Sequence, residues 1–315
     1  MLRGAYIDEL QLGDEFEGYF VLKDAQSKMS SAGKPFLSAT ISDCSGDMDA
    51  KVWDYSGPVS TEDIGKVIAI MGTVTEFKGA LQVTINRIRL ADEHDNYNRG
   101  KLVPSAPIDV DDAKNELKEA VASLSDPDYR RICETMLQRH EESLPEIPAA
   151  KVIHHSFLHG LLMHTLNMVR LADYLSDLYA DTLDRSLLIA GTCLHDIAKN
   201  QEFVVSELGL VTAYSVKGKL LGHLVMGAQE VAEVAAELGV PEEKSVLLQH
   251  MILSHHGKPE TGAAVVPMCA ESELLSYIDM IDSRMEIYHE TMNGLQVGEF
   301  SSRIFALDKP IYRHF

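Results

Sequence analysis

The sequence has few cysteines, no long apolar run and few basic side chains, and each shortage excludes a class of protein. The four cysteines are widely separated and form no CxxC pair, so neither a disulfide framework nor a thiolate zinc site is expected. No apolar run approaches the roughly 18 residues of a membrane span, and the first residues, MLRGAYIDELQLGDEF, lack the apolar core of a secretory signal. We therefore expect a cytoplasmic protein with reduced thiols and no membrane partner.

The chain is strongly acidic, with 28 basic against 48 acidic residues and a formal net charge of −20. The excess is present in both halves, since residues 1–95 carry 9 basic and 16 acidic side chains. Nucleic-acid backbones are bound mainly through Lys and Arg, so this balance argues against broad, non-specific duplex binding. It leaves room for a local basic groove or for bound cations.

Residues 13–92 are predicted to form a small β-barrel. Five segments alternate in polarity or are rich in β-branched residues, and turn sequences such as SSAG and DCSGD separate them. They read EFEGYFVLKDAQ, KPFLSATISD, MDAKVWDY, KVIAIMGTVTEF and ALQVTINRIRL. Five short strands with one longer connection, between the third and the fourth, favour a barrel of the oligonucleotide/oligosaccharide-binding (OB) type.

After a polar stretch with two prolines, the apolar residues recur with a helical period. Asp126-Pro127 predicts the start of one helix, and Gly239-Val240-Pro241 predicts the end of one helix and the start of the next. We expect a multi-domain α and β protein, in which an OB-fold nucleic-acid-binding domain precedes an all-α domain. The expected parts are the OB fold at 1–92, a linker at 93–110, a helical connector at 111–150 and the all-α domain at 151–315.

Histidine is concentrated in the helical region, where nine of the thirteen histidines fall between residues 154 and 256. His164 lies in an apolar helix, His195-Asp196 ends the apolar run GTCLHD, and Asp279 lies within LLSYIDMI. An unpaired buried carboxylate would cost several kcal/mol, and bound divalent cations would remove that cost. Imidazole and carboxylate donors without thiolates favour Mn, Fe or Co over structural Zn, and we rank Mg and Ni lower too.

The pattern H(164)…HD(195–196)…D(279) resembles the HD superfamily of metal-dependent phosphohydrolases. The additional histidines resemble its two-metal members, and HDIAK resembles the HDIGK form, which would make Lys199 a phosphate-facing ammonium. The resemblance implies two ions with Asp196 as a bridging, catalytic ligand. The implied ligands are His164, His195, Asp196, His223, His255, His256 and Asp279.

A narrower resemblance covers residues 10–300. IPAAKVIHHSFLHGLLMHT (147–165) is similar to a signature of the YhaM-type 3′-to-5′ exoribonucleases, and ISDCSGDMDAKVWDYS (41–56) is similar to their barrel segment. It implies metal-dependent hydrolysis of single-stranded RNA, or of single-stranded DNA, to nucleoside monophosphates. Two residues depart from the family pattern. His159 stands where the family tends to have glycine, and Met163 stands where it often has an acidic residue.

Candidate substrate contacts lie in both halves of the chain. In the barrel, Phe36 and Trp53 could stack on bases and Lys34, Lys51 and Arg87 could contact the backbone, as single-strand binders require; both aromatic rings could equally belong to the barrel core. In the helical half, His154 and His155 could contact the 3′ end or orient the first ligand helix.

Three alternatives stay open at this point. Asp282, one helical turn beyond Asp279, competes with it for the last ligand position, and we prefer Asp279 because it follows the apolar run directly. The enzyme could instead hydrolyse a small nucleotide or a cyclic dinucleotide, or the protein could bind single strands without catalysis. The sequence does not decide whether the chain forms a homo-oligomer.

Overall fold

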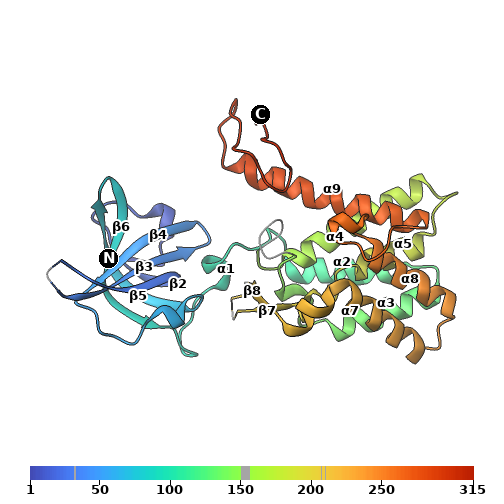
Figure 1. Ribbon diagram of the computed structural model, residues 1–315, viewed down its shortest axis with the longest axis horizontal. Helices are drawn as coiled ribbons and strands as arrows, with labels where there is room; N and C mark the ends of the chain where they lie inside the picture. The colour runs from blue at the N-terminus through green and yellow to red at the C-terminus, as the bar shows by residue number, and fades with distance from the viewer. Residues whose placement is uncertain (32, 150–156, 207, 210) are drawn as a thin grey trace. The chain divides into compact units, whose positions relative to one another are not determined.

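The computed structural model describes residues 1–31, 33–149, 157–206, 208–209 and 211–315. It divides into two units, which Figure 1 shows as a strand-rich part and a helical part. One unit comprises Met1–Ser105 with Ser206–Leu210, and the other comprises Ala106–Val205 and Val211–Phe315. Each unit is described by itself below.

Five strands of the first unit close into a barrel, in the order β2-β3-β4-β6-β5 and back to β2. The long strand β2 pairs antiparallel with both β3 and β5, whereas β4 and β6 pair in parallel. This is the strand order of the OB fold, so the prediction of an OB-type barrel is confirmed. The strands are Glu15–Met29 (β2), Pro35–Asp43 (β3), Gly46–Trp53 (β4), Val67–Phe77 (β5) and Ala80–Leu90 (β6).

Alternation along each strand separates the barrel core from its outer surface. Strand β3 buries Leu37, Ala39 and Ile41 and leaves the residues between them partly exposed, as a period of two requires. Phe16 and Phe20 of β2 add an edge-to-face ring pair at 5.8 Å between centroids. The outward-facing residues of β3 and β4 are therefore not part of the barrel core.

Short elements complete the first unit. A two-residue strand pairs in parallel with the start of β2, and a one-turn helix contacts β2 and β3. This helix lies within residues 93–110, the expected linker, and its Lys101 carbonyl accepts a hydrogen bond from the Cys44 amide. These elements are β1 (Leu2–Arg3), α1 (Arg99–Leu102) and the 3₁₀ turns Ile7–Glu9 and Thr61–Asp63.

The second unit is helical, as predicted, with one two-stranded hairpin that was not expected from the sequence. Its long helices are α2 (Val110–Ala122), α3 (Pro127–Arg139), α4 (Gly160–Leu178), α5 (Arg185–Leu194), α7 (Val216–Glu237), α8 (Glu242–Ser254) and α9 (Ala270–Asn293). Its short elements are α6 (Lys199–Glu202), β7 (Phe203–Val205), β8 (Val211–Tyr214) and the 3₁₀ turns Leu144–Glu146 and Pro259–Thr261. No helix among the described residues could span a membrane.

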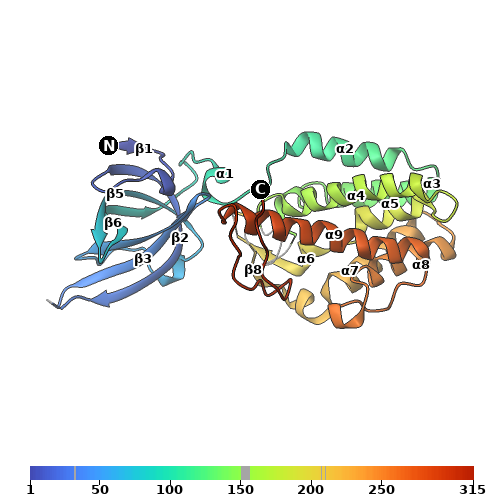
Figure 2. The same ribbon diagram turned by 90° about the horizontal axis from the view of Figure 1, so that it is seen from above.

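Helix α5 is the centre of this unit. It lies among the other long helices (Figure 2) and contacts α3, α4, α8 and α9. Residues 186–199 are all buried. A helix that is apolar on every face must lie inside a core, which explains the run SLLIAGTCL. Helices α2 and α3, from the stretch expected to be a connector, share this core.

Both helix signals in the sequence are confirmed. Asp126 accepts hydrogen bonds from the amides of Asp128 and Tyr129 at the start of α3, with Pro127 in the first turn. Gly239 adopts a left-handed φ of 65° between α7 and α8, a conformation that favours glycine.

Gly72 gives a test of barrel packing. A methyl group there would lie 2.7 Å from Val83 Cγ1 and 3.0 Å from the Thr84 carbonyl oxygen. We expect Gly72→Ala to lower the free energy of unfolding by about 1–3 kcal/mol. Fluorescence of Trp53, the only tryptophan, reports the barrel transition.

Gly46→Ala is the matched control, because no heavy atom lies within 4 Å of the added methyl group. Its effect should stay within about 0.5 kcal/mol. Equal midpoints for the two variants would contradict the described contact between β5 and β6.

Candidate metal centre

Seven side chains from separate elements converge at one end of α5. His195 and Asp196 follow α5 directly, His164 lies in α4, and Asp279 lies in α9. His223 lies in α7, and His255 and His256 follow α8. These are the seven metal ligands expected from the sequence, and the fold brings all of them together.

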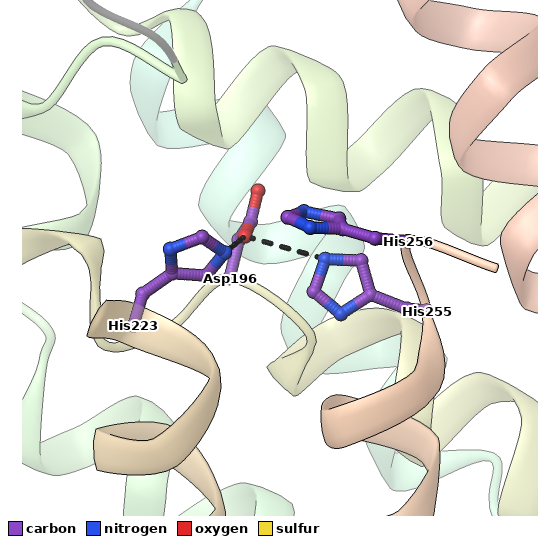
Figure 3. A group of neighbouring side chains, drawn as sticks. All are labelled: Asp196, His223, His255 and His256. Carbon is purple, nitrogen blue, oxygen red and sulfur yellow. Dashed lines mark ion pairs between the residues drawn. The ribbon is translucent and has the colours of Figure 1, made fainter. Parts of the chain in front are cut away.

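The donor atoms form two groups that share Asp196. Those of Asp196, His223, His255 and His256 all lie within 4.8 Å of one another (Figure 3). Those of His164, His195 and Asp196 satisfy the same limit. Asp279 Oδ1 adjoins the second group, 3.3 Å from His164 Nε2.

Backbone carbonyls orient two of the imidazoles. Nδ1 of His195 lies 2.8 Å from the Thr192 carbonyl oxygen, and Nδ1 of His255 lies 2.8 Å from that of Ile252. A carbonyl can only accept, so Nδ1 carries the proton in both rings. In a neutral ring the Nε2 lone pair then faces the cluster, which is the form that binds a metal.

Carboxylates orient two more imidazoles. Asp282 Oδ2 lies 2.7 Å from His164 Nδ1, and Glu202 Oε2 lies 3.0 Å from His223 Nδ1. Such contacts fix the ring and raise its basicity at metal sites. They also separate the two competing aspartates, because Asp279 adjoins Nε2 of His164 whereas Asp282 holds the opposite nitrogen.

A break in α7 places His223. Gly222 has φ 72° and ψ 161°, outside the helical region, and a second helical segment starts behind it. The His223 amide donates to Glu202 Oε1 at 3.1 Å. That backbone conformation is open to glycine and strained for other residues, so this glycine is required for the position of the ligand.

Several buried polar atoms of the cluster make no hydrogen bond and have one another as neighbours; His223 Nε2 lies 3.1 Å and His255 Nε2 3.6 Å from Asp196 Oδ1. Within the described part of the chain, these atoms are fully buried and lack a hydrogen bond: His195 Nε2, Asp196 Oδ1, His223 Nε2, His255 Nε2 and His256 Nδ1. Buried polar atoms are normally paired, and here the orphaned atoms are all potential metal donors. The residues present therefore fit one or two divalent cations.

The electrostatics of the cluster favour cation binding. Burial alone would raise the pKa of the Asp196 carboxyl, but Lys199 and the imidazoles hold it well below its usual range. Burial and the neighbouring His256 hold the pKa of His255 well below its usual value. Asp196 is therefore an anion and His255 a neutral ligand near pH 7.

The imidazoles of His164 and His223 have raised pKa values, in contrast to that of His255. Although burial disfavours the charged ring, Asp279 and Asp282 raise the pKa of His164 to about 9. Asp196 and Glu202 likewise raise the pKa of His223 to about 9, against the effect of burial. In the absence of cations these two rings are protonated and compensate the buried carboxylates.

Lys199 is buried beside Asp196. Its ammonium lies 2.6 Å from Asp196 Oδ2 and donates to the Ala149 carbonyl at 2.5 Å. An ammonium has three donors, and among the described residues two of them are used, by Asp196 and by the Ala149 carbonyl. The phosphate-facing role that the sequence implied for Lys199 stays a prediction.

Of the barrel candidates, Phe36, Lys51 and Trp53 lie in β3 and β4, Lys34 directly precedes β3, and Arg87 lies in β6. The rings of Phe36 and Trp53 lie 4.9 Å apart on paired residues, and Trp53 is 50% exposed. Trp53 is thus not a core residue. Lys51 donates to Ser38 at 2.6 Å, and Lys34 forms an exposed ion pair with Asp54.

His154 and His155, the substrate-contact candidates of the helical half, lie outside the described residues.

Comparison with known proteins identifies the helical region. Residues 161–284 match the family model of the HD domain. An HD domain indicates a metal-dependent phosphohydrolase, and the candidate ligands from His164 to Asp279 all fall inside the matched range. The combination of an OB-type barrel with an HD domain, expected from the sequence, is confirmed.

The barrel is similar to solved OB domains. One is the second OB-fold domain of replication protein A from Methanococcus maripaludis, with 14% identity over 31% of this chain and 100% of that chain, at a TM-score of 0.24. Another is an OB domain from Thermoplasma acidophilum, with 14% identity over 31% and 92% of the two chains, at 0.26. Because these TM-scores are low, the barrel assignment rests on strand order.

Two residues of the site had no signal in the sequence as orienting groups. Glu202 is separated from His223 by 21 positions, and Asp282 from His164 by 118. The one sequence signal for Asp282 was its position three residues after Asp279, which indicated that it lies near the cluster. Both are proposed here as residues that position an imidazole.

Metal binding should stabilise the HD domain. At a Mn²⁺ concentration 100-fold above the dissociation constant, the free energy of unfolding should rise by about 2.7 kcal/mol, because the orphaned donors become ligated. Thermal unfolding with Mn²⁺ and with a chelator measures the change. Asp196→Asn should abolish it.

Asp181→Asn makes the same chemical change at an exposed position and should leave the Mn²⁺ effect intact. An equal Mn²⁺-induced shift in Asp196→Asn and in the unaltered protein would show that the ion binds elsewhere.

Asp279 and Asp282 are predicted to differ in effect. Asp279→Asn removes a proposed ligand and should abolish Mn²⁺ binding, measured by calorimetry, at the group formed by His164, His195 and Asp196. Asp282→Asn leaves Nε2 of His164 in place and should weaken binding about 10- to 100-fold. The reverse order of severity would assign the last ligand to Asp282.

Proposed function

We propose that this protein is a metal-dependent 3′-to-5′ exoribonuclease that hydrolyses single-stranded RNA to nucleoside monophosphates, with single-stranded DNA as the other polymer to be tested. The observation that supports this most is the double role of Asp196, whose carboxylate belongs to both donor groups of the HD domain. A shared carboxylate between two such groups is typical of two-metal phosphodiester hydrolysis.

The proposed ligands follow from the two groups. His164, His195, Asp196 and Asp279 would hold one cation, and Asp196, His223, His255 and His256 would hold the other. Mn, Fe or Co suits these nitrogen and oxygen donors. Two bound divalent cations would supply activation of water near neutral pH and neutralisation of negative charge on the attacked phosphate.

The protein's own groups would complete the site. Lys199 holds Asp196 in one orientation through its 2.6 Å contact and would donate to a phosphoryl oxygen. In a buried setting such a fixed ammonium stabilises developing negative charge more strongly than it would in water. Lys199 is therefore proposed to be catalytic together with Asp196.

The barrel is proposed to bind the strand. OB folds bind oligonucleotides on the face made by their second and third strands, which here are β3 and β4. The half-exposed Trp53 beside Phe36 offers a surface for base stacking. Lys51 lies in β4 two residues before Trp53, and the exposed Lys34 directly precedes β3; both lysines are proposed to contact a backbone. Because the protein as a whole is acidic, a single strand would be expected to bind along these residues and not over the whole surface of the barrel.

Cleavage of a 5′-labelled single-stranded RNA in Mn²⁺ tests the proposal. A ladder that shortens from the 3′ end, with nucleoside monophosphates as products, is expected. His195→Ala and Asp196→Ala should lower kcat by more than about 100-fold, since each removes a proposed ligand, while the dissociation constant of the RNA should change little.

A parallel sample contains a cyclic dinucleotide in place of RNA. Hydrolysis of that compound alone would replace the proposed substrate with a small nucleotide. Binding of RNA with no cleavage of either compound would contradict catalysis altogether, and normal cleavage by either variant would show that the site is misplaced.

A further inference from the structure

The barrel unit contains a cavity of about 1020 Å³ that none of the functions above uses. Its lining comes from residues 3–6, from β2, β5 and β6, from Asp43 of β3, Val52 of β4 and Tyr55, and from residues 96–98, 101 and 102; it includes neither Phe36 nor Trp53. Small-molecule sites usually enclose about 300–1,000 Å³, so this cavity is large enough for more than one nucleotide.

Strand register explains the shape of the cavity. On three neighbouring strands, Tyr19, Ala69 and Arg89 lie side by side in one row, and Met71 and Arg87 lie together in another. Because Ala69 is small, the first row leaves a depression between an aromatic ring and a guanidinium. The depression is part of the cavity lining.

One wall is held rigid by an ion-pair network. Arg89 contacts Asp95 with two nitrogens, at 2.5 and 2.7 Å, and the Tyr19 hydroxyl donates to the same carboxylate at 2.7 Å. Tyr97 packs on Tyr19 with 5.4 Å between ring centroids. The aromatic wall is thus fixed before any ligand binds, which reduces the entropic cost of binding.

The cavity collects positive charge from an acidic unit. Of eleven Lys and Arg residues in 1–105, four line it, whereas only two of the sixteen Asp and Glu residues do. Both of those acids are engaged: Glu17 pairs with Arg3 at 2.7 Å, and Asp43 accepts a hydrogen bond from the Ile7 amide. Arg3 and Arg89 are likewise paired, with Glu17 and Asp95, so Arg87 and Lys101 are the lining cations without an ion pair among the described residues, and these two favour an anionic ligand.

Arg87 is the guanidinium available to that anion. Arg89, two residues along β6, is committed to Asp95, whereas the exposed side chain of Arg87 makes no ion pair or hydrogen bond with the described part of the chain. Lys101 lies at another edge, 4.8 Å from the centroid of the Tyr6 ring. Two cationic groups thus flank a tyrosine-lined space.

We propose that this cavity is a second nucleotide-binding site, separate from the β3–β4 surface. Tyrosine rings at Tyr6, Tyr19, Tyr55 and Tyr97 would stack on a base, Arg87 would contact its phosphate, and the Asn86 and Asn96 amides would hydrogen-bond a base edge. The ligand is a nucleotide unit, either within a single strand or as a free mononucleotide. Its binding does not require hydrolysis at the metal centre.

Photocrosslinking with a 5-iodouridine-containing oligouridylate locates the bound bases. The full chain is used with excess chelator, so that the probe stays intact whether or not the proposed nuclease activity exists. Crosslinks to the peptides that contain Tyr19 or Tyr97 are expected. Competition by uridine monophosphate would identify the free nucleotide as ligand, and its failure to compete would identify the strand; either result supports the site.

Binding of the same probe gives the energetic test. Tyr97→Ala should raise the dissociation constant about 5- to 150-fold, and Tyr97→Phe should restore it. Arg87→Gln should reduce the slope of log K against log salt by about 0.7, whereas Arg303→Gln, on the exposed C-terminal segment, should leave the slope unchanged. Crosslinks confined to Trp53 and Phe36, with unchanged binding by Tyr97→Ala and Arg87→Gln, would overturn the proposal.

Discussion

Burial of the Asp196 carboxylate is the constraint on which the arrangement of the helical unit depends. Its side chain is 4% exposed, and an isolated charge at such a depth is strongly unfavourable unless partners of opposite charge surround it. Lys199 and the protonated His223 supply that charge in the protein alone, and cations would supply it in the proposed holoenzyme. The candidate ligands around it accordingly come from three helices, α4, α7 and α9, and from the residues that follow two others, α5 and α8. The same groups that make the buried anion tolerable are the ones that would hold the ions.

Much of this arrangement could be predicted because its signals are local. The alternation in β3 and the continuous apolar run of α5 each predict a buried element, and His195-Asp196 are adjacent in the chain. The orienting roles of Glu202 and Asp282 could not be predicted, since they depend on contacts between distant helices. The hairpin of β7 and β8 was missed because strands of three and four residues have no period to detect. The sequence indicated a helix that starts at Gly222-His223, and the structure has a backbone break at Gly222 inside the longer helix α7.

His159 shows how a departure from a family pattern can be understood from backbone geometry. Its φ of 66° lies in the left-handed region, where glycine is the least strained residue, and the resembling family tends to have glycine there. Here the ring nitrogen Nδ1 lies 2.5 Å from the Pro145 carbonyl oxygen, a hydrogen bond that glycine could not make and that offsets part of the backbone strain. The departure thus affects the start of α4 and leaves the imidazole of His164, one turn further on, in place.

The central claim is that divalent cations occupy the space between the imidazoles and Asp196. Anomalous diffraction from crystals soaked in Mn²⁺ measures this most directly. Two anomalous peaks about 4 Å apart are expected, one beside Nε2 of His195 and one beside Nε2 of His223, with Asp196 between them. Absence of both peaks, with the imidazoles unmoved and Mn²⁺ bound at other positions, would contradict it.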